Sequence, residues 1–329
     1  MKKNILLWVL AFVITLGLAA YQRLTGPTHP MSGEININGE QIKYSFDRSH
    51  AGSTDHIVRL KVDPDKYAAV LCWKRFKTSD SWTEINMVED KGELIAAMPN
   101  QPHAGKLEYF IRIYAGFEIK TIPEQPVVIR FRGEVPTLIM IFHIITIFAA
   151  MLLSTRTGLE IFNKEPKLKS YTIWTIVTLF VGGLILGPVV QYYAFDAFWT
   201  GWPFGHDLTD NKTFAAFIGW VIAFFMMKKS KNPKGWIIFA ALLMLVVYLI
   251  PHSVLGSELD YEKIDKQAKP NKVSNDLPGI SYMNSPDIHV GDQFYEKDSG
   301  FSPNSISNVA KANRFFQLIP RPKGRGYLI

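Results

Sequence analysis

The residues best suited to chemistry lie at the two ends of a pair of apolar stretches in the second half of the chain. His206, Asp207 and Asp210 place one imidazole and two carboxylates within five residues, just before one apolar stretch. His252 and Glu258 follow the next. Imidazole and carboxylate groups are ligands for divalent cations, so these five residues are candidate metal ligands. Their spacing matches no established metal motif.

A structural interpretation of the same segment competes with the metal site. Thr209 or Asp210 would cap the helix that follows, because short polar side chains accept hydrogen bonds from the first free N–H groups of a helix. The segment also carries aromatic residues typical of a membrane–water interface, and these are Phe195, Phe198, Trp199, Trp202 and Phe204. The sequence favours this interpretation over metal binding.

His143 is the second chemical candidate, because it lies inside an apolar stretch. An ionisable residue within a membrane span is a candidate functional residue by default. His143 and His252 are the candidate cofactor ligands, but His252 would lie roughly 10 Å nearer the outer surface at 1.5 Å of helix rise per residue. This mismatch disfavours bis-histidine haem, and a neutral, packed His143 is the simpler expectation. Glycines 182, 183 and 187 would permit close helix contact or admit a flat cofactor, and contact is favoured.

No catalytic trio stands out, and this favours a non-enzymatic protein. The remaining histidines are scattered over surface and turn positions, at 29, 50, 56 and 103. Cys72 is the single cysteine of the chain, so an intrachain disulfide is excluded.

Five apolar segments would position these residues. A helix needs about 20 apolar residues to cross a bilayer, and the candidate spans are residues 4–22, 135–155, 170–195, 213–227 and 235–251. The first is either a cleaved signal peptide or a retained anchor. Its long apolar run ends in the bulky Tyr21, which favours the anchor.

Charge predicts how these segments are oriented. Lysine and arginine residues gather after the second and fourth segments, at positions 156, 164, 167 and 169 and at 228, 229, 231 and 234. The connection after the third is acidic, with Lys212 as its cation. Cationic connections stay in the cytoplasm. We therefore expect an inner (plasma) membrane protein with a cytoplasmic N-terminus, and with residues 24–134 and the C-terminal tail outside the cytoplasm.

Residues 33–133 alternate between apolar and polar positions, which predicts many short β-strands. Asn38-Gly39 is a favoured hairpin turn between two of them. From Ala97 to Arg112, a proline-rich corner and Gly105 precede a strand that carries Tyr109. In this pattern the region resembles bacterial extracellular Ig-like and fibronectin-III-like domains. The resemblance implies a β-sandwich and no particular activity.

The expected fold class is a multi-pass α-helical membrane protein with an inserted extracytoplasmic all-β Ig-like sandwich. Its parts are a signal anchor or signal peptide (1–23), the sandwich (24–134), a four-helix membrane region (135–257) and a largely irregular tail (258–329). The net charge of +7 does not indicate nucleic-acid binding, because the cations cluster between apolar segments.

Two functions remain open. The first is an envelope interaction or scaffold protein, whose partners are the lipid bilayer and another envelope protein. The second is a membrane redox or metal-linked protein that uses histidines near the outer face. A transporter is disfavoured, because no internal repeat or charged pathway is evident.

Overall fold

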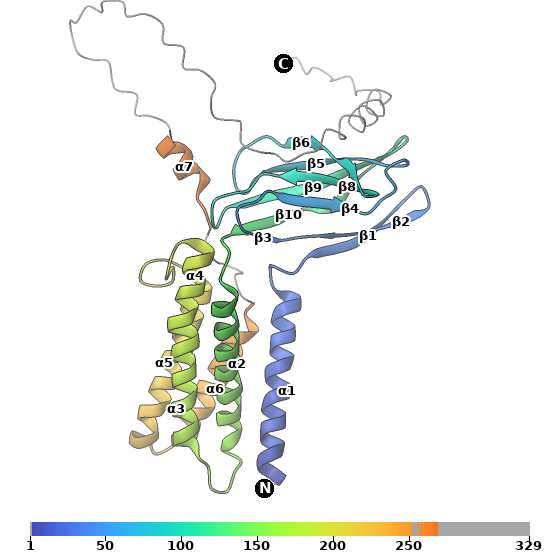
Figure 1. Cartoon of the computed structure of the whole chain (residues 1–329). Helices are drawn as coiled ribbons and strands as arrows, with labels where there is room; N and C mark the ends of the chain where they lie inside the picture. Colours follow the sequence, from blue (N-terminus) through green and yellow to red (C-terminus); the bar gives the residue numbers. More distant parts are fainter. Residues whose placement is uncertain (1, 252–255, 257, 269–329) are drawn as a thin grey trace, which may run out of the picture.

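The computed structural model describes residues 2–251, 256 and 258–268. Its helices form one elongated region and its strands another, and the β region lies across one end of the helices (Figure 1). The chain begins with α1 (Lys2–Thr25), crosses the β region and returns as helices. His252, and the tail after residue 268, lie outside the described residues.

The β region contains three sheets. The strands are β1 (Met31–Ile37), β2 (Glu40–Phe46), β3 (Ser49–Ala51), β4 (His56–Leu60), β5 (Ala68–Arg75), β6 (Thr83–Asn86), β7 (Val88–Asp90), β8 (Glu93–Met98), β9 (Lys106–Ala115) and β10 (Glu118–Arg132). They pair as β1-β2, β3-β10-β9-β5-β6 and β4-β8-β7. The hairpin prediction is confirmed, because Asn38 and Gly39 join β1 to β2 with positive φ angles of 52° and 84°.

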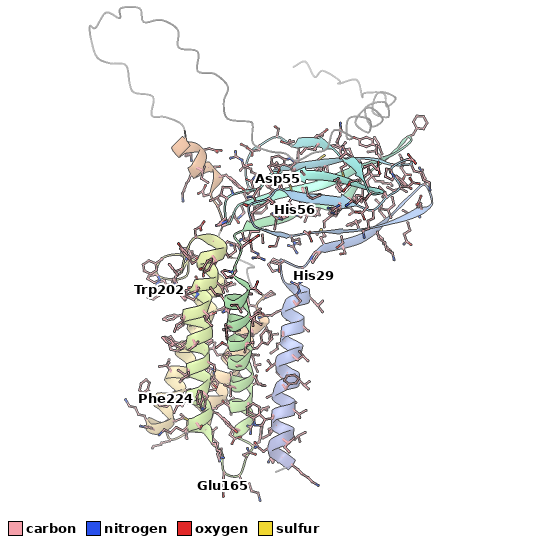
Figure 2. All side chains as sticks on the ribbon, in the orientation of Figure 1. His29, Asp55, His56, Glu165, Trp202 and Phe224 are labelled. Atoms are coloured by element: carbon pink, nitrogen blue, oxygen red, sulfur yellow. The ribbon has the colours of Figure 1, made fainter. Side chains whose placement is uncertain are left out.

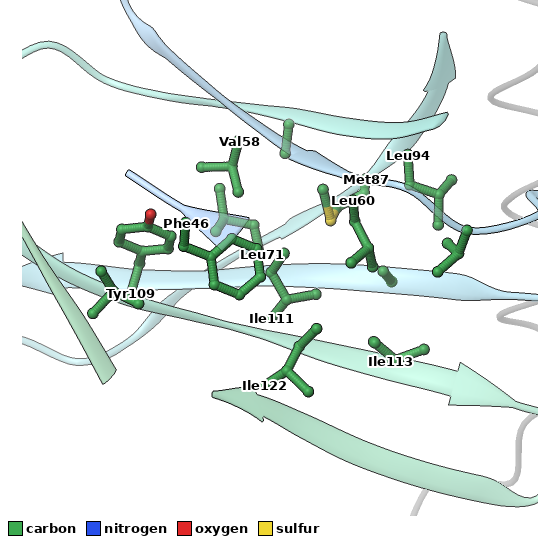
Figure 3. Packing of buried hydrophobic residues seen from close by; sticks show 14 of the residues in the cluster. Phe46, Val58, Leu60, Leu71, Met87, Leu94, Tyr109, Ile111, Ile113 and Ile122 are labelled. Carbon is green, nitrogen blue, oxygen red and sulfur yellow. The ribbon is translucent and has the colours of Figure 1, made fainter. Parts of the chain in front are cut away.

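The three sheets share one apolar core. Along β9 every second residue is buried, as the two-residue period of a strand requires. Phe46, Leu60, Leu71 and Ile111 come from different strands and meet in this core (Figure 3). The sequence therefore predicted a multi-sheet β region correctly.

The remaining helices are α2 (Thr137–Glu160), α3 (Leu168–Leu179), the π-helix η1 (Phe180–Leu186), α4 (Gly187–Phe195), α5 (Leu208–Lys229), α6 (Pro233–Leu249) and α7 (Tyr261–Ala268). α3, η1 and α4 follow one another without a break. Trp202 lies at the end of the helices next to the β region, and Glu165 lies at the opposite end (Figure 2). The tail expected to be largely irregular thus begins, within the described residues, with a short helix.

The expectation of about five spans is not supported. Three helical segments are long and apolar enough to cross a membrane: α1, α2 and the continuous segment 168–195. α6 is apolar but has only 17 residues. α5 is long enough but has Asp210 and Lys212 near its start and Lys228 and Lys229 at its end. Its apolar middle is too short to qualify.

Arg156 is not in a connection, where the charge pattern had placed it, but inside α2 with no exposed surface. Its Nη1 lies 2.5 Å from Glu160 Oε2, one helical turn further on. Its Nη2 donates to Asn4 of α1, and its guanidinium lies 5.4 Å from the ring of Trp8 and 5.0 Å from that of Tyr171. A buried charge needs such partners, and α1 supplies two of them.

We therefore expect α1 to be retained in the purified protein, since its removal would strip Arg156 of Asn4 and Trp8. Intact-protein mass spectrometry should give a chain that includes residues 4–22, and a mass lacking them would refute this.

Trp8→Leu should cost about 1–2 kcal/mol of stability through the lost cation–π contact, measured by thermal unfolding. Val9→Leu, at a neighbouring exposed position, is the matched control and should leave the melting temperature unchanged.

Candidate functional site

The polar segment between α4 and α5 is folded by its own acidic residues. Asp207 caps α5, and its side chain accepts from the N–H of Thr209 at 2.8 Å. The Asp210 carboxylate accepts from the N–H groups of Thr200 at 2.7 Å and Gly201 at 3.0 Å. These hydrogen bonds fix the loop over the start of α5, so both carboxylates stabilise the folded loop. The capping role was predicted for Thr209 or Asp210 but belongs to Asp207.

Of the candidate metal ligands, Asp207 and Asp210 lie together, since the Thr200 hydroxyl is 3.3 Å from each carboxylate. Among the described residues, no three histidine, cysteine, aspartate or glutamate side chains are placed to hold a metal ion. His206 is exposed. Glu258 lies on the β region, 2.9 Å from Lys77 Nζ and 2.7 Å from Lys106 Nζ. His252 is outside the described part of the chain.

The residues that do come together lie at the junction between the β region and the helices. The Gly133 N–H donates to the Ala194 carbonyl at 3.0 Å, and a Cβ at Gly133 would collide with the carbonyl oxygen of Tyr193. His103 Nδ1 lies 2.7 Å from Asp196 Oδ2. His103, expected to be an isolated turn histidine, instead joins the two regions.

Arg130 lies at the centre of this junction. Its guanidinium carbon is 3.9 Å from the centre of the Phe195 ring, close enough for a strong cation–π contact. Burial lowers the pKa of Arg130 to about 10, while the nearby carboxylates of Asp207 and Glu258 oppose the shift. Arg130 therefore stays cationic at neutral pH, and the charges of Asp207 and Glu258 favour this state.

The start of the tail is bound to the β region. The Leu259 N–H donates to the Ala104 carbonyl at 3.1 Å, and the Tyr261 hydroxyl donates to Gln101 Oε1 at 3.0 Å. Arg75 pairs with Asp265 at 2.8 Å and stacks on the Tyr261 ring at 5.1 Å. Residues 258–268 therefore form a latch on the β region.

Below the junction, a cavity of about 150 Å³ extends between the helices. His143 lines it, together with polar residues that sequence reasoning missed, namely Gln22, Arg130, Gln191, Lys212 and Tyr248. In the sequence, Gln191 interrupts one apolar stretch and Lys212 borders the next. These positions were the signal that could have identified both as residues of a polar site. His143 is thus the one predicted cofactor ligand among the described residues, and it lines a cavity.

Comparison with known proteins finds no relative. No family model matches the chain, no curated protein matches it, and no solved structure matches it.

The loop interpretation and the metal interpretation predict different mutational patterns. Asp210→Ala leaves the buried N–H of Gly201 and the half-buried N–H of Thr200 without this acceptor, at a cost of about 1–3 kcal/mol for the buried one and less for the other. Asp210→Asn, which keeps one acceptor oxygen, should cost less, and His206→Ala should cost nothing. Thermal unfolding of the purified protein measures all three, with and without EDTA. Equal losses for His206→Ala and Asp210→Ala, together with a loss in EDTA, would instead establish a metal site.

Proposed function

We propose that this chain is a membrane-anchored envelope protein that presents its β region, outside the cytoplasm, to a protein partner. The junction is the observation that carries the proposal. Backbone pairing at Gly133, the His103–Asp196 contact and the Arg130–Phe195 stack hold the β region in one orientation. A flexible spacer has no need of such contacts, whereas a docking surface benefits from preorganisation.

In the proposed membrane arrangement, α5 and α6 lie in the bilayer beside the three segments that are long and apolar enough to cross it. α5 and α6 pack with α2 and α3 in one apolar core through Met151, Leu179, Trp220 and Met244. Helices this closely packed would enter the bilayer together. The latch supports a common side for residues 24–134 and the start of the tail, which the charge pattern places outside the inner membrane. The Ig-like sandwich remains a proposal, supported by the shared core of the three sheets.

The partner would meet the tip of the β9–β10 hairpin. Phe117 is fully exposed there, and Ile119 is half-exposed. The turn of β1–β2 supports this tip, because Asn38 donates to the Ala115 carbonyl at 3.3 Å and to Glu118 Oε2 at 3.1 Å. Aromatic residues, phenylalanine among them, are enriched at protein–protein interfaces.

The alternative of a membrane redox or metal-linked protein now rests on His143 and its cavity. The outer acidic residues no longer support it, because their oxygens are used in folding the loop.

The topology is tested with single cysteines in a Cys72→Ser background. We expect Ser53→Cys on the β region and Lys266→Cys on α7 to react equally with a membrane-impermeant maleimide in intact cells. Lys164→Cys, in the connection between α2 and α3, should react only after the cells are permeabilised. Reaction of just one of the first two would refute the common side.

The docking function is tested by photo-crosslinking in cells. A benzophenone side chain at position 117 should give one discrete adduct, and the same group at the exposed Lys61 should not. Phe117→Ser should abolish co-purification of that partner yet change stability by no more than about 0.5 kcal/mol, as expected of a surface change. Absence of any adduct, with a lone monomer isolated in mild detergent, would refute the proposal.

A further inference from the structure

Two histidines of the β region lie with their rings in contact. His56 begins β4 (Figure 2), and His50 is on β3. Gly52 turns the chain between them, at a φ angle of 96° that favours glycine. The Nδ1 atoms of the two rings are 3.3 Å apart, and the ring centres are 5.1 Å apart. The sequence had indicated scattered surface and turn histidines, but these two form a pair.

A backbone carbonyl orients the ring of His50. Its Nε2 lies 2.7 Å from the Thr54 carbonyl oxygen. A carbonyl oxygen only accepts, so Nε2 carries the proton of the neutral ring, and Nδ1 is left with a lone pair on the side of His56. Histidines that bind metal ions almost always donate their other ring N–H to a carbonyl, a carboxylate or water. The Phe131 ring packs against His50 at 5.6 Å between ring centres and supports this orientation.

His56 is in the protonation state that binds a metal ion. Burial and the charge of His50 lower the pKa of His56 to about 4, and the charge of Asp47 opposes this shift. His56 is therefore neutral at neutral pH, as a histidine ligand must be. Its Nδ1–H donates to His50 Nδ1 at 3.3 Å. When an ion takes both Nδ1 atoms, this proton moves to Nε2 of the same ring, so the ring stays neutral.

The separation of the two nitrogens fits a tetrahedral ion. Zn²⁺ binds imidazole nitrogen at about 2.0–2.1 Å. Two nitrogens that are 3.3 Å apart then make an angle of roughly 107° at the ion, which is close to the tetrahedral angle. The right angle between neighbouring ligands of a square-planar or octahedral ion would instead require nitrogens about 2.9 Å apart at the same bond length. The pair therefore suits zinc.

The pair can be reached from the surface. His50 is only partly buried, and His56 lines a groove of about 570 Å³ along β4. Asp47 lines the same groove, and its negative charge acts on His56 in the sense that favours a cation there. Among the described residues, no third histidine, cysteine, aspartate or glutamate is placed to join the two imidazoles. Water therefore completes the coordination.

We propose that His50 Nδ1 and His56 Nδ1 together bind one Zn²⁺ ion. The ion would tie β3, in the five-stranded sheet, to β4, in the three-stranded sheet. It would stabilise the β region, because a ligand that binds the folded state better than the unfolded chain shifts the equilibrium towards folding. This site does not depend on the proposed docking function, and it lies in the β region rather than at His143.

The experiment is isothermal titration calorimetry with ZnCl₂ on the full-length protein, purified without a histidine tag and stripped of metal with EDTA. The protein is held in nanodiscs of zwitterionic lipid, and empty nanodiscs are subtracted. The wild type should bind one Zn²⁺ saturably, and Ca²⁺, which takes oxygen ligands, should not compete for the site. His50→Ala and His56→Ala should each lose at least tenfold in affinity. His206→Ala, which removes an exposed imidazole from the loop before α5, is the matched control and should bind as the wild type does.

Thermal unfolding checks that each variant is folded. Zn²⁺ should raise the melting temperature of the wild type and of His206→Ala but not that of His50→Ala. If the buried His56→Ala variant does not fold, His50→Ala decides the test alone. A wild type that binds no Zn²⁺, or undiminished binding by a folded His50→Ala protein, would overturn the proposal. Either result would leave the docking function untouched.

Discussion

Polar groups buried among apolar helices must find partners within the protein, because no water is there to receive them. Three such groups organise the helical region. Arg156 holds α1 against α2 and α3 through Asn4, Trp8 and Tyr171. His143 draws α2 to the π-turn after α3. Asp210 folds the loop between α4 and α5.

The same need of buried polar groups for partners determines how the β region is attached to the helices. β10 leads almost directly into α2, so one chain connection already brings the two regions together. Arg130 is buried where they meet and is accommodated by the Phe195 ring and by the nearby carboxylates. The latch at residues 258–268 then binds the chain, as it leaves the helices, to the β region. The β region is thus held by three separate segments of the chain.

Periodicity and turn chemistry predicted the local structure. The Asn38-Gly39 hairpin and the alternating strands follow from rules that act over a few residues, and the structure has them. The sequence predicted five spans, but three segments are long and apolar enough to cross a membrane. The other two fall short because α5 has charged residues near both ends and α6 has only 17 residues. Arg156 was misplaced because a cation near the end of an apolar run resembles a loop residue. Its pairing with Glu160, four residues on, was the local signal that was missed.

The candidate site could be predicted only in part, because its contacts join distant residues. His103 and Asp196 are 93 positions apart, and nothing in their surroundings in the sequence relates them. The acidic loop attracted a metal hypothesis through its composition, whereas the structure uses those oxygens to accept backbone N–H groups. His143, a polar residue in the apolar helix α2, lines a cavity. Its cavity depends on how several helices pack, which periodicity does not encode.

The central claim is that the β region is held in one orientation on the helical region. Electron spin resonance measures this directly, through the distance between a spin label at Lys61 on the β region and one at Lys228 at the far end of α5, in nanodiscs and a Cys72→Ser background. The account predicts a single narrow distance distribution, which broadens when Arg130→Ala and Asp196→Ala remove the junction contacts. A broad or multiple distribution in the otherwise unaltered protein would contradict it.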